Sequence, residues 1–246
     1  MGTLSKHILA TLRQEIARYD KPENRINYQR FFKEPLKNPV GLKTAFLRKA
    51  FSTCYKEFRR YSGREIFDAC DQLLASKERY TASLAFEWTS KLSSDFNAND
   101  IDRFESWIEK YVNDWAASDS LCGPLGLFVK KFPRSVSRIY KWTRSQNRWF
   151  RRVSAVCLIP SLQEGLLLDA AFKTADALLL DDDDMVQKGY GWMLKVASNR
   201  FPEEVYKFVD ARKERMPRTA LRYAIEKFPA NSRKQLMKQP GSTPKP

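Results

Sequence analysis

Apolar residues recur at helical spacing, every three or four positions, along almost the whole chain. No segment alternates apolar and polar residues as a half-buried strand does, and only 9 glycines occur among 246 residues. This pattern predicts an all-α fold, with short connections that favour antiparallel packing of consecutive helices. The predicted helices cover residues 4–18, 24–33, 40–61, 64–76, 79–93, 99–117, 121–131, 134–144, 147–159, 164–179, 184–199, 202–213, 217–228 and 230–238.

A degenerate internal repeat favours an open stack of helices over a closed bundle. Four helical segments carry a basic residue near their start, namely Arg79, Arg152, Lys188 and Arg218, at intervals of 73, 36 and 30 residues. Half of the first interval falls near Trp115, which gives a period in the mid-thirties. Such a period is typical of an α-solenoid of HEAT-like antiparallel helix pairs. Equivalent positions then lie roughly 10 Å apart, and we expect the basic residues to line a concave groove.

No change of composition marks a domain boundary before the last residues of the chain. We therefore expect a single HEAT-like domain over residues 1–238. The segment that follows, residues 239–246, is rich in proline, glycine and serine and lacks apolar periodicity, so we expect a disordered tail.

The charge of the chain points to a polyanionic partner. Lys and Arg number 44 against 29 Asp and Glu, which gives a formal charge of +15. Lysines and arginines that neutralise phosphates release counterions from nucleic acid, so a basic protein of this kind favours DNA or RNA. Charge alone leaves an acidic protein partner and a merely soluble basic protein open as alternatives.

Several classes of protein and of site are disfavoured. The cysteines are scattered in apolar surroundings without a C-x-x-C pair, which argues against a disulfide framework and a zinc site. No apolar run is long enough to span a bilayer, and no signal-peptide pattern opens the chain, so we expect a soluble, cytoplasmic monomer that binds no membrane. Phosphate-binding loops, Ser/His/Asp arrangements and H-E-x-x-H motifs are missing from the sequence. We expect no metal and no cofactor, and any catalysis must rest on a carboxylate.

Four consecutive aspartates, Asp181 to Asp184, precede a predicted helix. A metal site is one interpretation. Because adjacent aspartates on a loop cannot all face one ion, capping of the helix and interaction with its dipole explain them better.

Trp115 and Asp119 lie four residues apart and therefore share one face of a helix, at the edge of a buried stripe. Two interpretations remain open on spacing alone. Asp119 caps a helix that starts near Leu121, or it is a functional carboxylate beside an indole.

Three segments, "DWAASD", "SQNRWFRRVSAV" and "VQKGYGWMLKVAS", carry W-x-x-x-D, N-x-W-x-x-R and Q-K-x-x-G-W patterns in that order. The chain in this respect resembles the AlkD-type DNA alkylation repair glycosylases, which are HEAT-like repeat proteins that remove alkylated purines from duplex DNA. A Y-x-x-x-F pattern starting at Tyr28 extends the resemblance to most of residues 20–230. The residues that carry the three patterns are Trp115, Asp119, Asn147, Trp149, Arg152, Gln187, Lys188, Gly191 and Trp192.

The resemblance implies roles for individual residues. Asp119 matches the catalytic aspartate, Trp115 and Trp192 match the tryptophans that flank the lesion, and Arg152 and, more loosely, Tyr28 match residues of the same cleft. The basic residues expected along the DNA backbone are Arg79, Lys188, Lys195 and Arg218. Lys195 departs from the family, which often has arginine there, and lysine loses the bidentate fork. The glycine–tyrosine run before Trp192 is also unusual.

The chemistry fits a carboxylate acting without a histidine. A cationic alkylpurine is already a good leaving group, and a carboxylate stabilises the oxocarbenium ion that forms on the deoxyribose and orients the attacking water. We therefore expect a DNA-alkylpurine N-glycosylase of base excision repair, acting on duplex DNA that contains 3-methyladenine or 7-methylguanine, with the lesion read from the backbone side of a shallow cleft, as the resemblance implies. A non-catalytic DNA-binding module and a protein-interaction scaffold are the alternatives. The preferred adduct and the acceptance of bulky lesions stay open.

Overall fold

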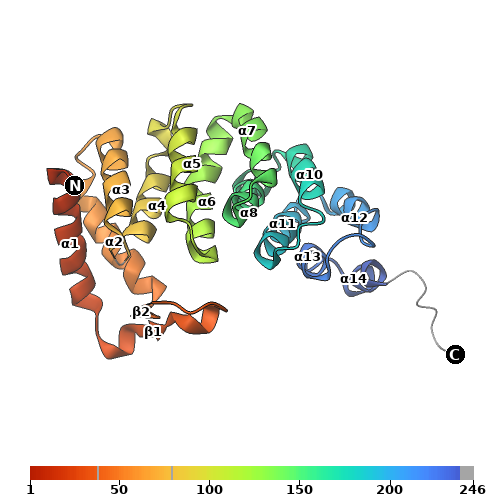
Figure 1. The fold of residues 1–246 in the computed structure, drawn as a ribbon, viewed down its shortest axis with the longest axis horizontal. Helices are drawn as coiled ribbons and strands as arrows, with labels where there is room; N and C mark the ends of the chain where they lie inside the picture. The colour runs from red at the N-terminus through yellow and green to blue at the C-terminus, as the bar shows by residue number, and fades with distance from the viewer. Residues whose placement is uncertain (38, 79, 239–246) are drawn as a thin grey trace. The chain divides into compact units, whose positions relative to one another are not determined.

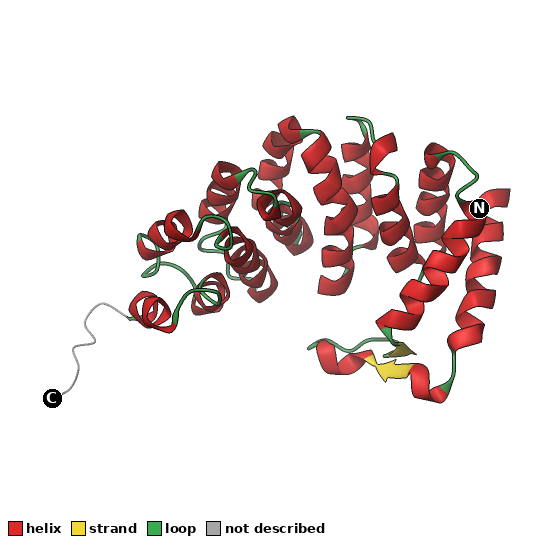
Figure 2. Cartoon of the chain, turned by 180° about the vertical axis from the view of Figure 1, so that it is seen from behind, coloured by secondary structure: helices red, strands yellow, loops and turns green. Residues whose placement is uncertain are grey.

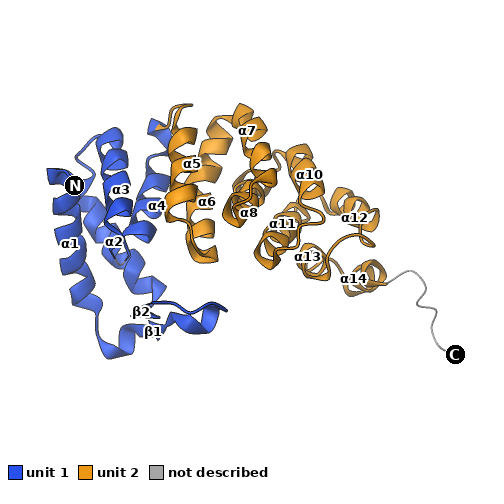
Figure 3. Ribbon diagram, viewed as in Figure 1, with its two compact units in different colours: residues 1–95 blue, residues 96–246 orange. Residues whose placement is uncertain are grey.

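The computed structural model describes residues 1–37, 39–78 and 80–238. Within it the chain divides into two compact units, residues 1–95 and residues 96–246 (Figure 3), which are described separately. Arg79 and the predicted tail 239–246 lie outside the described residues.

In the described residues of the first unit there are four α-helices and one small hairpin. The amphipathic helix α1 packs on α2 and α3, and α3 packs on α4. Its α-helices are α1 (Thr3–Tyr19), α2 (Thr44–Phe58), α3 (Gly63–Ser76) and α4 (Thr81–Lys91). The 3₁₀ turns η1 (Pro22–Asn24) and η2 (Tyr28–Phe31) lie between α1 and α2, and η3 (Ser93–Asp95) follows α4.

The helix predicted over residues 24–33 is wrong. Strand β1 (Arg25–Asn27) and the 3₁₀ turn η2 occupy its place, and β1 pairs antiparallel with β2 (Val40–Leu42) in a small two-stranded sheet (Figure 2). In this pairing Ile26 lies opposite Gly41. The side chain of Gln29 explains part of this outcome, because it hydrogen-bonds the Phe32 and Glu34 carbonyls at 3.0 Å each and competes with a regular helix. Local side-chain bonding of this kind leaves no periodic signal.

The second unit is a stack of helices. In chain order it contains α5 (Asp100–Tyr111), α6 (Trp115–Lys131), η4 (Pro133–Ser135), α7 (Val136–Lys141), η5 (Trp142–Arg144), α8 (Arg148–Val156), α9 (Ile159–Gln163), α10 (Leu168–Ala177), α11 (Asp184–Ala197), α12 (Pro202–Asp210), α13 (Arg218–Ala224) and α14 (Ala230–Met237).

The helices of this unit form two rows (Figure 1). In the first row, α6, α8, α11 and α13 pack on one another in succession. The second row lies beside the first and consists of α5, α7, α10 and α12. This alternation confirms the predicted all-α helical-repeat fold. Trp115, Arg152, Lys188 and Arg218, the positions of this unit that the predicted repeat relates, all lie on helices of the first row.

The core of each unit is apolar and rich in aromatic side chains. Trp88 of the first unit and Trp107 and Trp142 of the second are almost completely buried, which confirms that these tryptophans serve packing. The indole of Trp88 also donates a hydrogen bond to the Phe51 carbonyl at 3.2 Å, so its polar atom is satisfied inside the core. All four cysteines are buried as well.

Candidate functional site

Helix α6 presents Trp115 and Asp119 on consecutive turns. The carboxylate of Asp114 caps the helix by accepting a hydrogen bond from the Ala117 amide at 2.8 Å, and the helix runs without a break to Lys131. The expected break between residues 117 and 121 is therefore wrong, and so is the interpretation of Asp119 as a cap. With the cap supplied by Asp114, the carboxylate of Asp119 is left for another partner.

That partner is Arg152 of α8. Its Nε donates to Oδ1 of Asp119 and its Nη2 donates to Oδ2, both at 2.9 Å, which is a two-point fork. The Asn147 side chain caps α8 by accepting from the Trp149 amide at 2.9 Å. The N-x-W-x-x-R pattern thus starts a helix and sets the arginine in its second turn.

The two partners of this ion pair differ in exposure. The side chain of Arg152 is 6% exposed and that of Asp119 is 21% exposed. The cation is therefore covered by protein, and the anion is accessible to solvent. A bidentate arginine uses one lone-pair direction of each carboxylate oxygen, which leaves the others open to an incoming group.

A third helix completes the arrangement. Nη1 of Arg152 donates to the main-chain carbonyl of Met185, in the first turn of α11. The guanidinium therefore ties α6, α8 and α11 together, and the position of the Asp119 carboxylate depends on all three helices.

The thiol of Cys122 lies close enough to the ion pair for both of its charges to affect it. Burial raises the pKa of the Cys122 thiol well above its usual range, and Cys157 and the negative charge of Asp119 raise it further, against the opposing effect of Arg152. A thiol held in its neutral form is a poor nucleophile. Of the two described groups that accept hydrogen bonds from Arg152, the Asp119 carboxylate is the charged one.

One face of α11 carries the three predicted residues of that helix, Lys188, Trp192 and Lys195, all partly exposed. Both lysines are ion-paired: Nζ of Lys188 lies 2.8 Å from Asp184, and Nζ of Lys195 lies 3.0 Å from Glu226. A DNA phosphate could bind either lysine only by replacing its carboxylate partner.

The remaining predicted residues lie elsewhere. Arg218 opens α13, is exposed and donates to the Met237 carbonyl at 3.3 Å. Tyr28 belongs to the first unit, where its hydroxyl donates to the Leu42 carbonyl at 2.5 Å. Of the predicted site residues, the structure joins Asp119 directly to Arg152 and places Trp115 one turn before Asp119.

One of the four consecutive aspartates acts as the sequence predicted, and the run also forms ion pairs that the sequence reasoning missed. Asp183 caps α11 by accepting from the amides of Met185 and Val186 at 2.8 and 3.2 Å, which confirms the capping interpretation. In addition, Asp183 pairs with Arg148 at 2.9 Å, and Asp181 pairs with Arg151 at 2.7 Å. The signal for these pairs was available, because a run of arginines precedes a run of aspartates by about one repeat.

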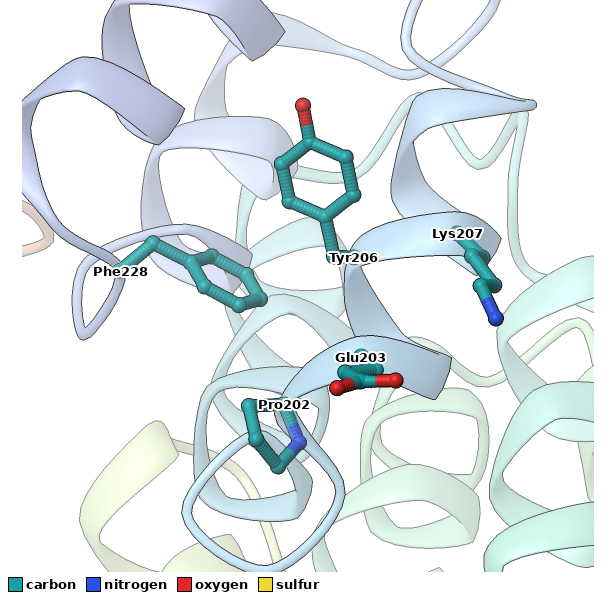
Figure 4. Close-up of a pocket in the computed structure, with 5 residues that line it drawn as sticks. All are labelled: Pro202, Glu203, Tyr206, Lys207 and Phe228. Carbon is teal, nitrogen blue, oxygen red and sulfur yellow. The ribbon is translucent and has the colours of Figure 1, made fainter.

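Other features of the second unit offer less chemistry. A shallow hollow on α12, lined by Pro202, Glu203, Tyr206, Lys207 and Phe228 (Figure 4), is mainly apolar and shares no residue with the Asp119 site. In the described part of the chain, no group of three His, Cys, Asp or Glu residues is arranged to hold a metal ion. None of the helices described has the length and apolar character needed to traverse a bilayer.

Comparison with known proteins agrees with this arrangement of helices. The sequence profile of a family described as "DNA alkylation repair enzyme" matches residues 12–228. A solved structure, a predicted DNA alkylation repair enzyme from Enterococcus faecalis, shares the fold with a TM-score of 0.62 at 17% identity, over 74% of this chain and 86% of that one. No significant match is found among curated protein sequences. The family profile spans most of the chain, including every helix of the Asp119 site, and the protein therefore belongs to the DNA alkylation repair enzyme family.

Proposed function

We propose that the protein is a DNA glycosylase that hydrolyses the N-glycosidic bond of cationic alkylated purines, such as 3-methyladenine and 7-methylguanine, in duplex DNA. The observation that carries the proposal is the Asp119 carboxylate, held at both oxygens by a buried arginine and yet 21% exposed. The exposed part of this carboxylate is accessible to a substrate that binds from the solvent side.

The chemistry follows from the charge of the substrate. An N3- or N7-alkylated purine carries a positive charge and departs without protonation, so positive charge builds on the deoxyribose as the bond breaks. A fixed carboxylate stabilises that charge, because its orientation is set before the reaction and costs no reorganisation. The oxygen lone pairs that Arg152 does not use orient the attacking water.

The two partly exposed tryptophans supply recognition. Trp115 precedes Asp119 by one turn on α6, and Trp192 lies on the partly exposed face of α11. An indole face attracts a cation by about 0.5 to 2 kcal/mol. Such contacts favour the charged lesion over a neutral base and pack against the sugar.

The C-terminal part of the second unit, residues 211–238, binds DNA through its positive charge. Residues 211–238 contain nine Lys and Arg residues and two Glu. Arg215, Arg218 and Arg222 are all exposed. Contacts from such residues to phosphates would position the duplex and carry no sequence preference. Lys188 and Lys195 would join them after exchanging their carboxylate partners for phosphates. Arg79 stays a predicted contact to the DNA backbone, and Tyr28 stays a predicted contact to the lesion. We propose that the protein acts as a monomer.

A binding module without catalysis is the second candidate, and one observation favours it. The Asp119 carboxylate bonds Arg152, which ties three helices, and an ion pair of that kind has a structural role of its own. In this case the protein would hold duplex DNA and release no base. A scaffold for acidic proteins is distinguished by salt, because duplex affinity falls steeply with ionic strength only when phosphates are bound.

Release of 7-methylguanine from a methylated duplex separates these functions. We expect release by the wild type, and a loss on the order of 10³-fold in Asp119→Asn, which keeps the shape of the side chain and removes its charge. The matched control is Asp176→Asn, because Asp176 forms a similar two-point fork with Arg212. Equal duplex binding by all three proteins, with no release from any, would favour the binding module.

A further inference from the structure

Glycine occupies a position inside α11 where a side chain would disturb Arg152. A methyl group at residue 189 would lie 3.1 Å from Cγ and 3.4 Å from Nη1 of Arg152, and 3.4 Å from Cγ2 of Val156. Apart from proline, glycine is the least favourable residue in a helix interior, so its presence here needs a reason. The close passage of the arginine supplies one.

The Met185 carbonyl, which accepts a hydrogen bond from Nη1 of Arg152, lies one helical turn before Gly189. In a regular α-helix the amide of residue 189 bonds the carbonyl of Met185, and this carbonyl also accepts Nη1 of Arg152. Gly189 therefore leaves open the space through which the guanidinium reaches its carbonyl partner. The same passage brings Nε and Nη2 of Arg152 to the oxygens of Asp119.

Two further ion pairs fix the start of α11 against α8. Arg151 donates to Asp181 at 2.7 and 3.3 Å, and Arg148 pairs with Asp183 at 2.9 Å. Both arginines belong to α8, as Arg152 does. The Met185 carbonyl is thus held at a set distance from the helix that carries Arg152.

We propose that Gly189 is a positioning residue: by leaving room beside the Met185 carbonyl, it sets the guanidinium of Arg152 and, through it, the orientation of the Asp119 carboxylate toward the sugar. The inference rests on the proposed function for its catalytic part. Its steric part, the coupling of residue 189 to Arg152, is independent of any activity. Both residues of the unusual glycine–tyrosine run therefore have a structural explanation. Gly189 leaves room for Arg152, and Tyr190 is buried in the core, where its hydroxyl donates to the Leu179 carbonyl at 3.1 Å.

The steric part is tested by thermal unfolding of four proteins: wild type, Gly189→Ala, Arg152→Ala and the double variant. Alanine favours a helix more than glycine does. We expect Gly189→Ala to raise Tm in the Arg152→Ala background, where the crowded side chain is gone, and to raise it less or lower it in the wild type. An equal change of Tm in both backgrounds would overturn the inference.

Should the Arg152→Ala variants fail to fold, the crystal structure of Gly189→Ala decides the same question. We expect the guanidinium of Arg152 to move by several tenths of an ångström relative to the Asp119 carboxylate. An unmoved guanidinium would overturn the inference.

The catalytic part is tested by single-turnover release of 7-methylguanine at saturating protein. Since a misplacement of 1 Å costs about 10²-fold, we expect Gly189→Ala to lose about 3- to 10-fold in rate with an unchanged Kd for the duplex. The substitution should cause no further loss in the Asp119→Asn background. A loss confined to Kd, or a rate equal to that of the wild type, would contradict the positioning role.

Gly165→Ala is the matched control. Gly165 has a φ of 78°, so alanine there strains the backbone, and the atom nearest to its added methyl group is Cζ of Phe201 at 3.8 Å. We expect a lower Tm and an unchanged rate of release. If the wild type releases no base, the proposed function fails, and the unfolding comparison still judges the coupling of residue 189 to Arg152.

Discussion

Two adjacent arginines of α8 form two ion pairs that are opposite in exposure. In the pair between Arg152 and Asp119, the arginine is 6% exposed and the aspartate 21%. In the pair between Arg151 and Asp181, the arginine is 17% exposed and the aspartate 8%. Both arginines bond both oxygens of their aspartate, so the chemistry of the two pairs is the same and their orientation toward solvent differs.

The difference separates a structural tie from a candidate reactive group. The Asp181 carboxylate also accepts the Asp183 amide at 3.0 Å, and Nη1 of Arg151 bonds the carbonyls of Ser145 and Gln146 at 3.0 and 3.1 Å. These bonds close the loop before α11 and leave little of the carboxylate for a ligand. At Asp119 the protein covers the cation and leaves part of the anion accessible to solvent, which is compatible with the proposed role of the carboxylate in stabilising a positive charge.

Removing each carboxylate should have unequal effects on folding. We expect Asp119→Ala to lower the free energy of unfolding by about 3 to 5 kcal/mol, because Arg152 is left as a buried cation without a counter-charge. We expect about 1 to 3 kcal/mol for Asp181→Ala, because Arg151 keeps two carbonyl partners and some contact with water. Urea titration of both variants measures the difference, and the reverse order would break the comparison.

Replacing each arginine by lysine should affect catalysis at only one of the pairs. Lysine keeps the charge and loses the planar fork, so Asp119 would lose one of its two bonds and its fixed orientation. We expect Arg152→Lys to slow base release by about 10- to 10²-fold, since orientation of a catalytic group contributes strongly to rate. Arg151→Lys should stay within a few-fold of the wild type in the same single-turnover assay. Equal losses would show that the two pairs do not differ in function.

The two tryptophans proposed to flank the lesion should affect its recognition. We expect Trp115→Ala and Trp192→Ala each to weaken the preference for a cationic base by about 0.5 to 2 kcal/mol. Trp142→Phe is the control, because Trp142 is buried and its indole donates to Glu105 at 2.8 Å. Competition binding between duplexes with 7-methylguanine and with guanine gives the preference. An unchanged ratio in both alanine variants would remove the tryptophans from the site.

The smallest expected effect concerns the exposed cations. Arg222→Ala should weaken duplex binding alike for damaged and undamaged DNA and reduce the slope of log K against log salt by about 1. Lys213→Ala, whose lysine pairs with Asp210 at 2.7 Å, should change the slope less. Titrations at several salt concentrations compare them. If Lys213→Ala reduced the slope more than Arg222→Ala, the DNA would contact Lys213 rather than Arg222.

Helical periodicity was sufficient to predict the fold class and most helices, because apolar faces recur wherever helices stack. It failed where side chains of particular residues override propensity. The Gln29 side chain bonds nearby carbonyls in the segment after β1, and the Asp114 cap starts α6 earlier than an acid at 119 suggested. Both outcomes depend on the direction of one side chain, which apolar spacing does not record.

The candidate site was only partly predictable for a similar reason. The resemblance of their motifs to those of the family selected Trp115, Asp119 and Arg152 as candidates, but the sequence did not reveal that Arg152 would be buried and bound to the Met185 carbonyl. A hydrogen bond to a main-chain carbonyl cannot be predicted from residue types, because every residue carries that group. The role inferred for Gly189 likewise depends on how closely α8 and α11 approach, which is set by packing.

The central claim is that the Asp119 carboxylate stabilises positive charge on a deoxyribose. The most direct measurement compares the affinities of wild type and Asp119→Asn for two duplexes, one with a cationic pyrrolidine in place of the abasic sugar and one with a neutral tetrahydrofuran. We predict that the wild type prefers the cationic duplex by about tenfold or more, as expected for a preorganised charge, and that Asp119→Asn loses this preference. Equal affinity of the wild type for both duplexes, or a preference that survives in Asp119→Asn, would contradict the claim.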